Sequence, residues 1–200
     1  MSRTRKAETA TNKDLRRSFG TLERIEGEGN ERKFLLSFSS EEPYERWFGV
    51  EILDHGPGAV DLTRLNDIGC LLFNHNRDAV IGKINRAWIE GNRGLAEVEF
   101  DTDEQSEIIF RKVDNQTLKG VSVGYRIDSL EEVTAGKTSA DGRFTGPCEI
   151  ARKWCPYEIS IVSVPADATV GVGREADQPG GVPLGVFESQ LQINKNVIGR

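Results

Sequence analysis

Most apolar residues of this chain fall into short runs rich in β-branched and aromatic residues, bounded by glycine, proline or polar turns. The runs lie within residues 32–50, 70–84, 86–100, 121–128 and 157–165. This pattern is typical of strands. The sequence "EGNRG" separates two of the runs and predicts a hairpin. The chain is therefore expected to form a mainly β domain, shaped as a barrel or a sandwich.

One segment has a clear helical pattern, "DTDEQSEIIFRKVDNQTLKG" at residues 101–120. Asp101 or Thr102 is the expected N-terminal cap, acidic residues fill the first turn, and Gly120 is the expected terminator. A shorter helical step is expected after "HGPG" at residues 55–58, which cannot continue regular structure. The fold class is thus α+β, with a few helices packed outside the β structure.

The two ends of the chain differ from its middle. Residues 1–18 carry six Lys or Arg against two acidic residues, whereas the whole chain has a net charge of -6. We expect a flexible basic arm at 1–31, one folded domain at 32–172, and a tail punctuated by glycine and proline at 173–200. Within the domain, the polar stretch 129–149 is an inserted loop or hairpin. The acidic balance disfavours nucleic acid as a direct partner.

The cysteines and the hydropathy pattern further restrict the kinds of protein to which this chain can belong. Cys70, Cys148 and Cys155 are odd in number and show no CxxC or Cys/His ligand spacing. A disulfide framework and a zinc site are therefore not indicated, and a reducing cytosol is expected. No apolar run approaches the length of a membrane span.

Only two histidines are available as bases near neutral pH. His55 lies in a turn of glycine and proline, where a solvated or capping role is expected. His75 follows an apolar run, at the end of an expected strand, where a rigid element can present it to a cleft. A hydrogen-bonded structural histidine is the alternative at such a position, so a catalytic role requires a partner.

Ser122 in "LKGVSVGY" is the candidate partner. On a strand it shares a face with Gly120 and Gly124, which leaves a bare strip of backbone for another polypeptide to approach. A serine becomes a good nucleophile when a base removes its proton and a third group orients that base. The alternative is an ordinary strand serine, with the glycines serving as a cap and a bulge.

Glu158 in "YEISIVSVPAD" is the candidate third group, because a carboxylate heading an apolar strand must be paired or face a cleft. Its alternative is a solvated strand-end glutamate. Asp167 is the rival acid, although a turn or cap role suits it better. A cysteine hydrolase is disfavoured. Cys70 precedes His75 by five residues on what is expected to be one strand, so the side chains would face opposite ways, and Cys155 directly precedes a proline.

Four blocks of sequence carry a resemblance to a known family. They are "RWFGVEILDH", "LLFNHNRDAVIGKI", "LKGVSVGYRI" with the helix before it, and "WCPYEISIVSVPAD". In this order they resemble the prohead proteases of tailed bacteriophages, a serine peptidase family related in fold to the herpesvirus assemblins. The resemblance covers residues 33–172, and the length of the 129–149 stretch is a departure from it.

This resemblance implies a compact, assemblin-like β-barrel of about seven strands, surrounded by a few helices. It implies Ser122 as nucleophile, His75 as general base and Glu158 as the acid, with no cofactor or metal. Backbone N–H groups of residues 120–124, helped by Arg126, are the candidate oxyanion donors.

The resemblance also implies a biological setting. The expected substrates are the phage scaffold, the major capsid protein and the protease itself, cut inside a procapsid that assembles in the cytoplasm of the bacterial host. A homodimer is expected by analogy with the assemblins, and no nucleic acid or membrane partner is expected. The alternative function is a non-enzymatic capsid-assembly module that binds capsid protein by strand addition.

Overall fold

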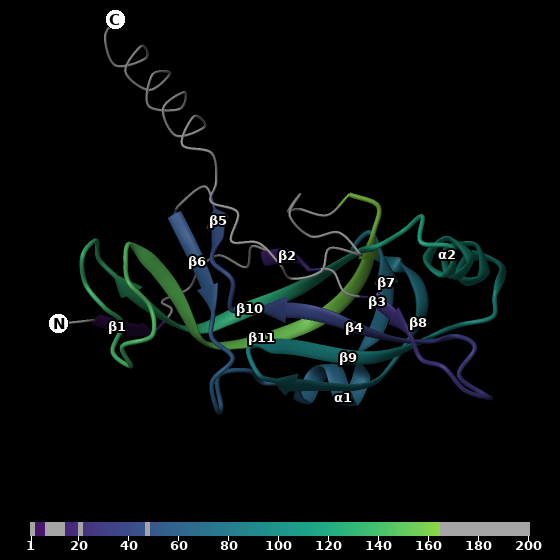
Figure 1. Cartoon of the computed structure of the whole chain (residues 1–200), viewed down its shortest axis with the longest axis horizontal. Helices are drawn as coiled ribbons and strands as arrows, with labels where there is room; N and C mark the ends of the chain where they lie inside the picture. The colour runs from purple at the N-terminus through teal and green to yellow at the C-terminus, as the bar shows by residue number, and fades with distance from the viewer. Residues whose placement is uncertain (1–2, 7–14, 20–21, 47–48, 165–200) are drawn as a thin grey trace, which may run out of the picture.

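The computed structural model describes residues 3–6, 15–19, 22–46 and 49–164 of the chain (Figure 1). Two helices and eleven strands are found in these residues. The helices are α1 (Thr63–Ile68) and α2 (Glu104–Asp114). The strands are β1 (Arg3–Lys6), β2 (Leu15–Phe19), β3 (Leu22–Arg24), β4 (Lys33–Ser40), β5 (Tyr44–Arg46), β6 (Gly49–Leu53), β7 (Cys70–Phe73), β8 (Asn76–Glu90), β9 (Arg93–Phe100), β10 (Gly120–Val133) and β11 (Cys148–Val162).

All of these strands join one curled sheet, whose main path runs β1-β10-β11-β7-β8-β9-β4-β3. Off this path, β2 pairs with β10, β6 with β11, and β5 with β6. The sheet curls so that β4 lies close to β2 and β10 (Figure 1). The expected mainly β class with few helices is confirmed. The strand count of eleven differs from the expected seven or so, partly because the N-terminal segment contributes strands of its own.

The hairpin of β10 and β11 runs through the middle of the sheet (Figure 1). Its antiparallel ladder extends from Gly120 opposite Val162 to Val133 opposite Cys148. The polar stretch 129–149 therefore forms the far end of this hairpin: its flanks continue the two strands, and residues 134–147 connect them. The extra length extends the hairpin and leaves the pairing near Ser122 in place.

The main hydrophobic core lies on one face of β10 and β11. Val121 and Val123 of β10 and Ile159 and Ile161 of β11 are fully buried in it. Because side chains alternate between the two faces of a strand, the residues between these four lie on the opposite face. This alternation places Ser122, Ser160 and Glu158 away from the main core.

Helix α2 confirms the predicted helix but not its predicted ends. Asp103, rather than Asp101 or Thr102, is the cap, and its carboxylate accepts from the backbone N–H groups of residues 105 and 106 at 3.1 Å each. The helix stops at Asp114 rather than near Gly120. Asn115 explains the early stop, since its side chain accepts from Thr117 N–H at 3.1 Å in a local turn that competes with the helix.

Within the predicted N-terminal arm, the described residues include three short strands. β1 and β2 pair with one edge of β10, and β3 pairs with β4. An edge strand offers unpaired backbone groups that recruit another strand. In this pairing the backbone of Arg3 lies in register with Glu132 of β10. The predicted tail at 173–200 lies outside the described residues.

Candidate active site

Three neighbouring strands, β10, β11 and β7, supply the candidate site. β11 lies between the other two, antiparallel to β10 and parallel to β7. Ser122 of β10 lies directly opposite Ser160 of β11, and Gly124 lies opposite Glu158. Directly opposed residues of an antiparallel pair share a face. Ser122 and Glu158 therefore lie on the same face, two positions apart along the ladder.

His75 does not lie on a strand but in the tight turn between β7 and β8. Both turn residues have left-handed backbone, with φ of 51° at Asn74 and 59° at His75. Asparagine tolerates this conformation better than most residues. Two hydrogen bonds connect the turn to β11. Asn74 N–H donates to the carbonyl of Ile161 at 2.9 Å, and His75 N–H donates to Ser160 Oγ at 3.1 Å.

The imidazole of His75 is paired with Glu158. Its Nδ1 lies 2.6 Å from Glu158 Oε1, and the side chains are 11% and 10% exposed. A carboxylate at Nδ1 holds the proton on that nitrogen, so Nε2 is the basic ring nitrogen. The other carboxylate oxygen, Oε2, accepts from the hydroxyl of Ser160 at 3.1 Å. This is the arrangement of a histidine base oriented by an acid.

Gly124 makes room for this carboxylate. A Cβ on Gly124 would lie 2.5 Å from Glu158 Oε1 and 2.8 Å from Cε2 of Tyr157. No real Cβ makes such contacts, so only glycine lets the Glu158 side chain lie over β10 at this point. The bare strip expected beside Ser122 is therefore occupied, at Gly124, by the acid itself.

The structure thus brings His75 and Glu158 into contact and places Ser122 on the adjoining strand, opposite Ser160. Ser122 is 1% exposed. The backbone of Ser18 in β2 pairs with Ser122 on the other edge of β10. Asp167, the rival acid, lies outside the described residues. Arg126, a candidate oxyanion donor, pairs with Asp128, with 2.7 Å between Nε and Oδ1.

His55 corrects the expectation of a solvated turn residue. It is 5% exposed and packs edge-on against the ring of Trp154, with 5.4 Å between ring centroids. Its Nε2 meets Ser39 Oγ at 2.7 Å and its Nδ1 meets the carbonyl of Leu53 at 2.9 Å. The glycines and proline turn the backbone, but the side chain is buried by residues distant in sequence.

Ser39 and His55 form a second serine–histidine pair, which must be weighed against the first. Ser39 is fully buried, and its Oγ would lie only 2.3 Å from a Cβ on Gly94, so β9 covers it. The second ring nitrogen of His55 bonds a backbone carbonyl, which cannot stabilise an imidazolium as a carboxylate does. We assign this pair to the core.

The pKa values of two thiols argue against a cysteine hydrolase. Burial raises the pKa of Cys70, and the charge of Glu158 raises it further. Burial also raises the pKa of Cys155. A catalytic cysteine needs the opposite shift. The expected reason, alternation along one strand from Cys70 to His75, was wrong because β7 ends at Phe73 and His75 lies in the turn.

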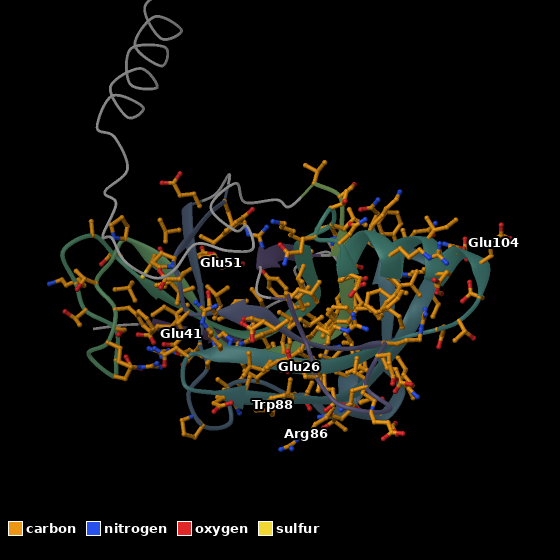
Figure 2. The ribbon with its side chains drawn as sticks, turned by 45° about the vertical axis from the view of Figure 1, so that its right-hand side comes forward. Glu26, Glu41, Glu51, Arg86, Trp88 and Glu104 are labelled. Carbon is orange, nitrogen blue, oxygen red and sulfur yellow. The ribbon has the colours of Figure 1, made fainter. Side chains whose placement is uncertain are left out.

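A cluster of two arginines and four acids, here called the arginine cluster, ties the far end of the β10–β11 hairpin to the loop after β6. Its members are Arg143, Arg152, Asp54, Asp141, Glu131 and Glu41. Figure 2 shows Glu41 at the end of the molecule away from Glu104 of α2. Asp54 joins both arginines, 2.6 Å from Arg143 and 2.7 Å from Arg152.

These pairs lower the pKa values of two acids of the cluster, Asp54 and Asp141. Burial alone would raise the pKa of Asp54, but hydrogen bonds from both arginines outweigh it and hold that pKa below the usual range. The hydrogen bond from Arg152 is the main reason that the pKa of Asp141 is lowered. Asp54 and Asp141 are therefore charged at neutral pH and paired with the two arginines.

Sequence reasoning missed Ser160 and the Ser39–His55 pair. One sequence pattern could have identified Ser160: it lies two residues after Glu158 in an alternating strand and therefore shares a face with Glu158. Among the described residues, no group of three or more His, Cys, Asp and Glu side chains is arranged to hold a metal ion. No helix of the described part is long and apolar enough to cross a membrane.

Comparison with known proteins adds independent information. A family model described as caudovirus prohead serine protease matches residues 50–178, which include His75, Ser122 and Glu158. A protein of Halomonas phage phiHAP-1 named major capsid protein is 38% identical over 147 residues, or 72% of this chain. The match spans 23% of that longer relative. No solved structure matches the chain.

Proposed function

Because the chain belongs to the caudovirus prohead serine protease family, we propose that it cleaves peptide bonds with Ser122 as nucleophile, His75 as general base and Glu158 as the acid that orients His75. The observation that carries this proposal is the 2.6 Å contact between His75 Nδ1 and Glu158 Oε1, on the face of the sheet that also bears Ser122. In the Ser39–His55 pair, by comparison, His55 Nδ1 meets the backbone carbonyl of Leu53 at 2.9 Å.

The proposed reaction follows from the roles of these groups. His75 Nε2 takes the proton of Ser122 as Oγ attacks the scissile carbonyl, and the carboxylate of Glu158 stabilises the imidazolium that forms. His75 then gives the proton to the leaving amine. Water attacks the acyl-enzyme with His75 again as base, which releases the acyl group and restores Ser122.

The proposed substrates are phage structural proteins: scaffold, major capsid protein and the protease chain itself. The proposed setting is the assembling procapsid in the bacterial cytoplasm, with a homodimer as the proposed form. The family match supports a role in procapsid maturation, and the name of the Halomonas phage relative supports an association with capsid protein.

That relative also favours a second candidate function. A stretch similar to this chain lies within a longer protein named major capsid protein, as expected of a domain that assists capsid assembly. In this alternative the chain binds capsid protein by strand addition and Ser122 performs no chemistry.

Intact mass spectrometry separates the two candidates. The wild-type chain, Ser122→Ala and the control Ser39→Ala are incubated alone and with the major capsid protein of the same phage. Fragments from the wild type and from Ser39→Ala, but not from Ser122→Ala, are the result expected of the protease. Binding of capsid protein without cleavage by a folded wild-type chain, in assembled procapsids as well, would establish the assembly module instead.

A further inference from the structure

We propose that Ser160 is a positioning residue of the site, and this inference rests on the proposed function. Its side chain is fully buried, and its hydroxyl contacts both the backbone of the candidate base and the carboxylate of the candidate acid. Ser160 Oγ accepts from the backbone N–H of His75 at 3.1 Å and donates to Glu158 Oε2 at 3.1 Å. One hydroxyl therefore fixes the backbone that carries the base and the carboxylate that orients it.

The first effect of the hydroxyl is on the backbone of His75. A left-handed conformation is unfavourable for a residue with a Cβ, and two such residues in succession need support from their surroundings. At Asn74 the support comes from the carbonyl of Ile161, and the side-chain oxygen of Asn74 accepts from Ser163 N–H at 2.9 Å. At His75 the backbone support is the Ser160 hydroxyl. Without it, the residue that carries the base can relax toward a commoner conformation.

The second effect is on the Glu158 carboxylate. Oε1 faces His75 Nδ1 and Oε2 faces Ser160, so the two contacts fix the plane of the carboxylate as well as its position. A glutamate side chain has three rotatable bonds and loses orientation easily when one contact is removed. Loss of the hydroxyl would remove one hydrogen-bond donor from the partly buried Glu158 carboxylate and so weaken the alignment of that carboxylate with His75.

The third effect links the base to the nucleophile. Ser160 lies directly opposite Ser122 in the β10–β11 ladder, where paired Cβ atoms are about 5 Å apart. The hydroxyl that holds the His75 turn thus belongs to the residue nearest Ser122 across the ladder. Ser160 sets the separation of base and nucleophile, and it does so without taking part in bond making or breaking.

The test needs no knowledge of the natural substrate. A fluorophosphonate probe reacts with an activated serine: the Oγ–P bond forms, fluoride leaves, and the base accepts the serine proton. The maximal labelling rate, kinact, reports activation, whereas KI reports probe binding. Ser160→Thr keeps the hydroxyl, and Ser160→Val has nearly the same shape without it, so this pair isolates the hydroxyl from any effect of packing. Ser160→Ala is the less crowded variant.

We expect kinact to fall by about 10- to 100-fold in Ser160→Ala and Ser160→Val, with KI unchanged, and to recover in Ser160→Thr. Ser39→Ala, another buried serine bonded to a histidine, is the control and is expected to label at the wild-type rate. A second readout is the downfield proton resonance of His75 Nδ1–H, followed in Ser122→Ala. It is expected to broaden or shift when Ser160→Ala is added.

Equal kinact values for wild type, Ser160→Ala and Ser160→Val would overturn the positioning role, as would an unchanged His75 resonance. A loss of equal size in Ser160→Thr and Ser160→Val would assign the effect to packing and also overturn the proposal. The proposed function fails by a different result, namely probe labelling at the wild-type rate in Ser122→Ala.

Discussion

Gly124→Ala tests whether the Glu158 carboxylate orients His75. The substitution adds a single methyl group on the strand that carries the nucleophile, and it leaves Ser122, His75 and Glu158 chemically intact. The new Cβ would lie 2.5 Å from Glu158 Oε1 and 2.6 Å from its Cγ. The carboxylate must therefore move, and this movement displaces Oε1, the oxygen that bonds His75.

The size of the effect follows from these distances. Ordinary contact begins near 3.4 Å, so Oε1 must retreat by about 0.9 Å. Because Oε1 lies 2.6 Å from His75 Nδ1, that retreat can take the pair to about 3.5 Å, where the hydrogen bond is largely lost. A misplacement of about 1 Å can slow a reaction roughly 100-fold, which corresponds to about 2.7 kcal/mol of activation free energy.

The assay is the rate of fluorophosphonate labelling, with circular dichroism to confirm the fold. A double-mutant cycle shows whether the effect passes through the acid. In a Glu158→Ala background the obstructed carboxylate is gone, so Gly124→Ala is expected to change the remaining rate by less than about twofold. A folded Gly124→Ala variant with the wild-type rate would refute the reasoning, and so would a full loss that persists without Glu158.

Three further predictions concern other parts of the molecule. Ser39→Ala is expected to lower Tm by about 3 °C, since it removes a buried hydrogen bond to His55, and to leave labelling unchanged; a large loss of labelling would instead make His55 the base. Asp54 and Asp141 have depressed pKa values in the folded state, so their contribution to the free energy of unfolding is complete above about pH 4 and is lost as the pH falls. Urea unfolding from pH 7 to 3 should therefore show a shallower acid loss for Asp54→Asn, and an unchanged slope would contradict it. Deletion of residues 1–19 exposes the outer edge of β10 and is expected to promote self-association, measured by light scattering; a deletion variant that associates no more than the full chain would show that the edge needs no cover.

The local elements were predictable where a short stretch of sequence decides the structure. The hairpin of β8 and β9 follows from two apolar runs around Gly91, whose φ of 56° suits the turn. Helix α2 follows from its spacing of Ile109 and Val113 and from its charges. These features depend on neighbours within a few residues, which is the range over which sequence patterns are informative.

The N-terminal strands and the burial of His55 were not predictable in this way. The sequences of β1 and β2 are basic and have no apolar alternation, and these segments form strands because β10 offers an edge for backbone pairing. His55 is buried by Trp154 and Ser39, which lie 99 and 16 positions away in the chain. Both outcomes depend on contacts that a local pattern does not contain.

The candidate site depends most on the register of β10 against β11, and of the three irregularities in that ladder the one between Gly124 and Tyr125 adjoins the site. Tyr125 pairs with Pro156 but Gly124 pairs with Glu158, so the ladder skips Tyr157 between them. If the pairing beyond Tyr125 continued without this bulge, Gly124 would face Tyr157 and Ser122 would face Ile159. A shift of one residue turns every side chain to the other face. The bulge therefore places Ser122 beside Ser160 and places Glu158 over Gly124, which has no Cβ to obstruct the carboxylate.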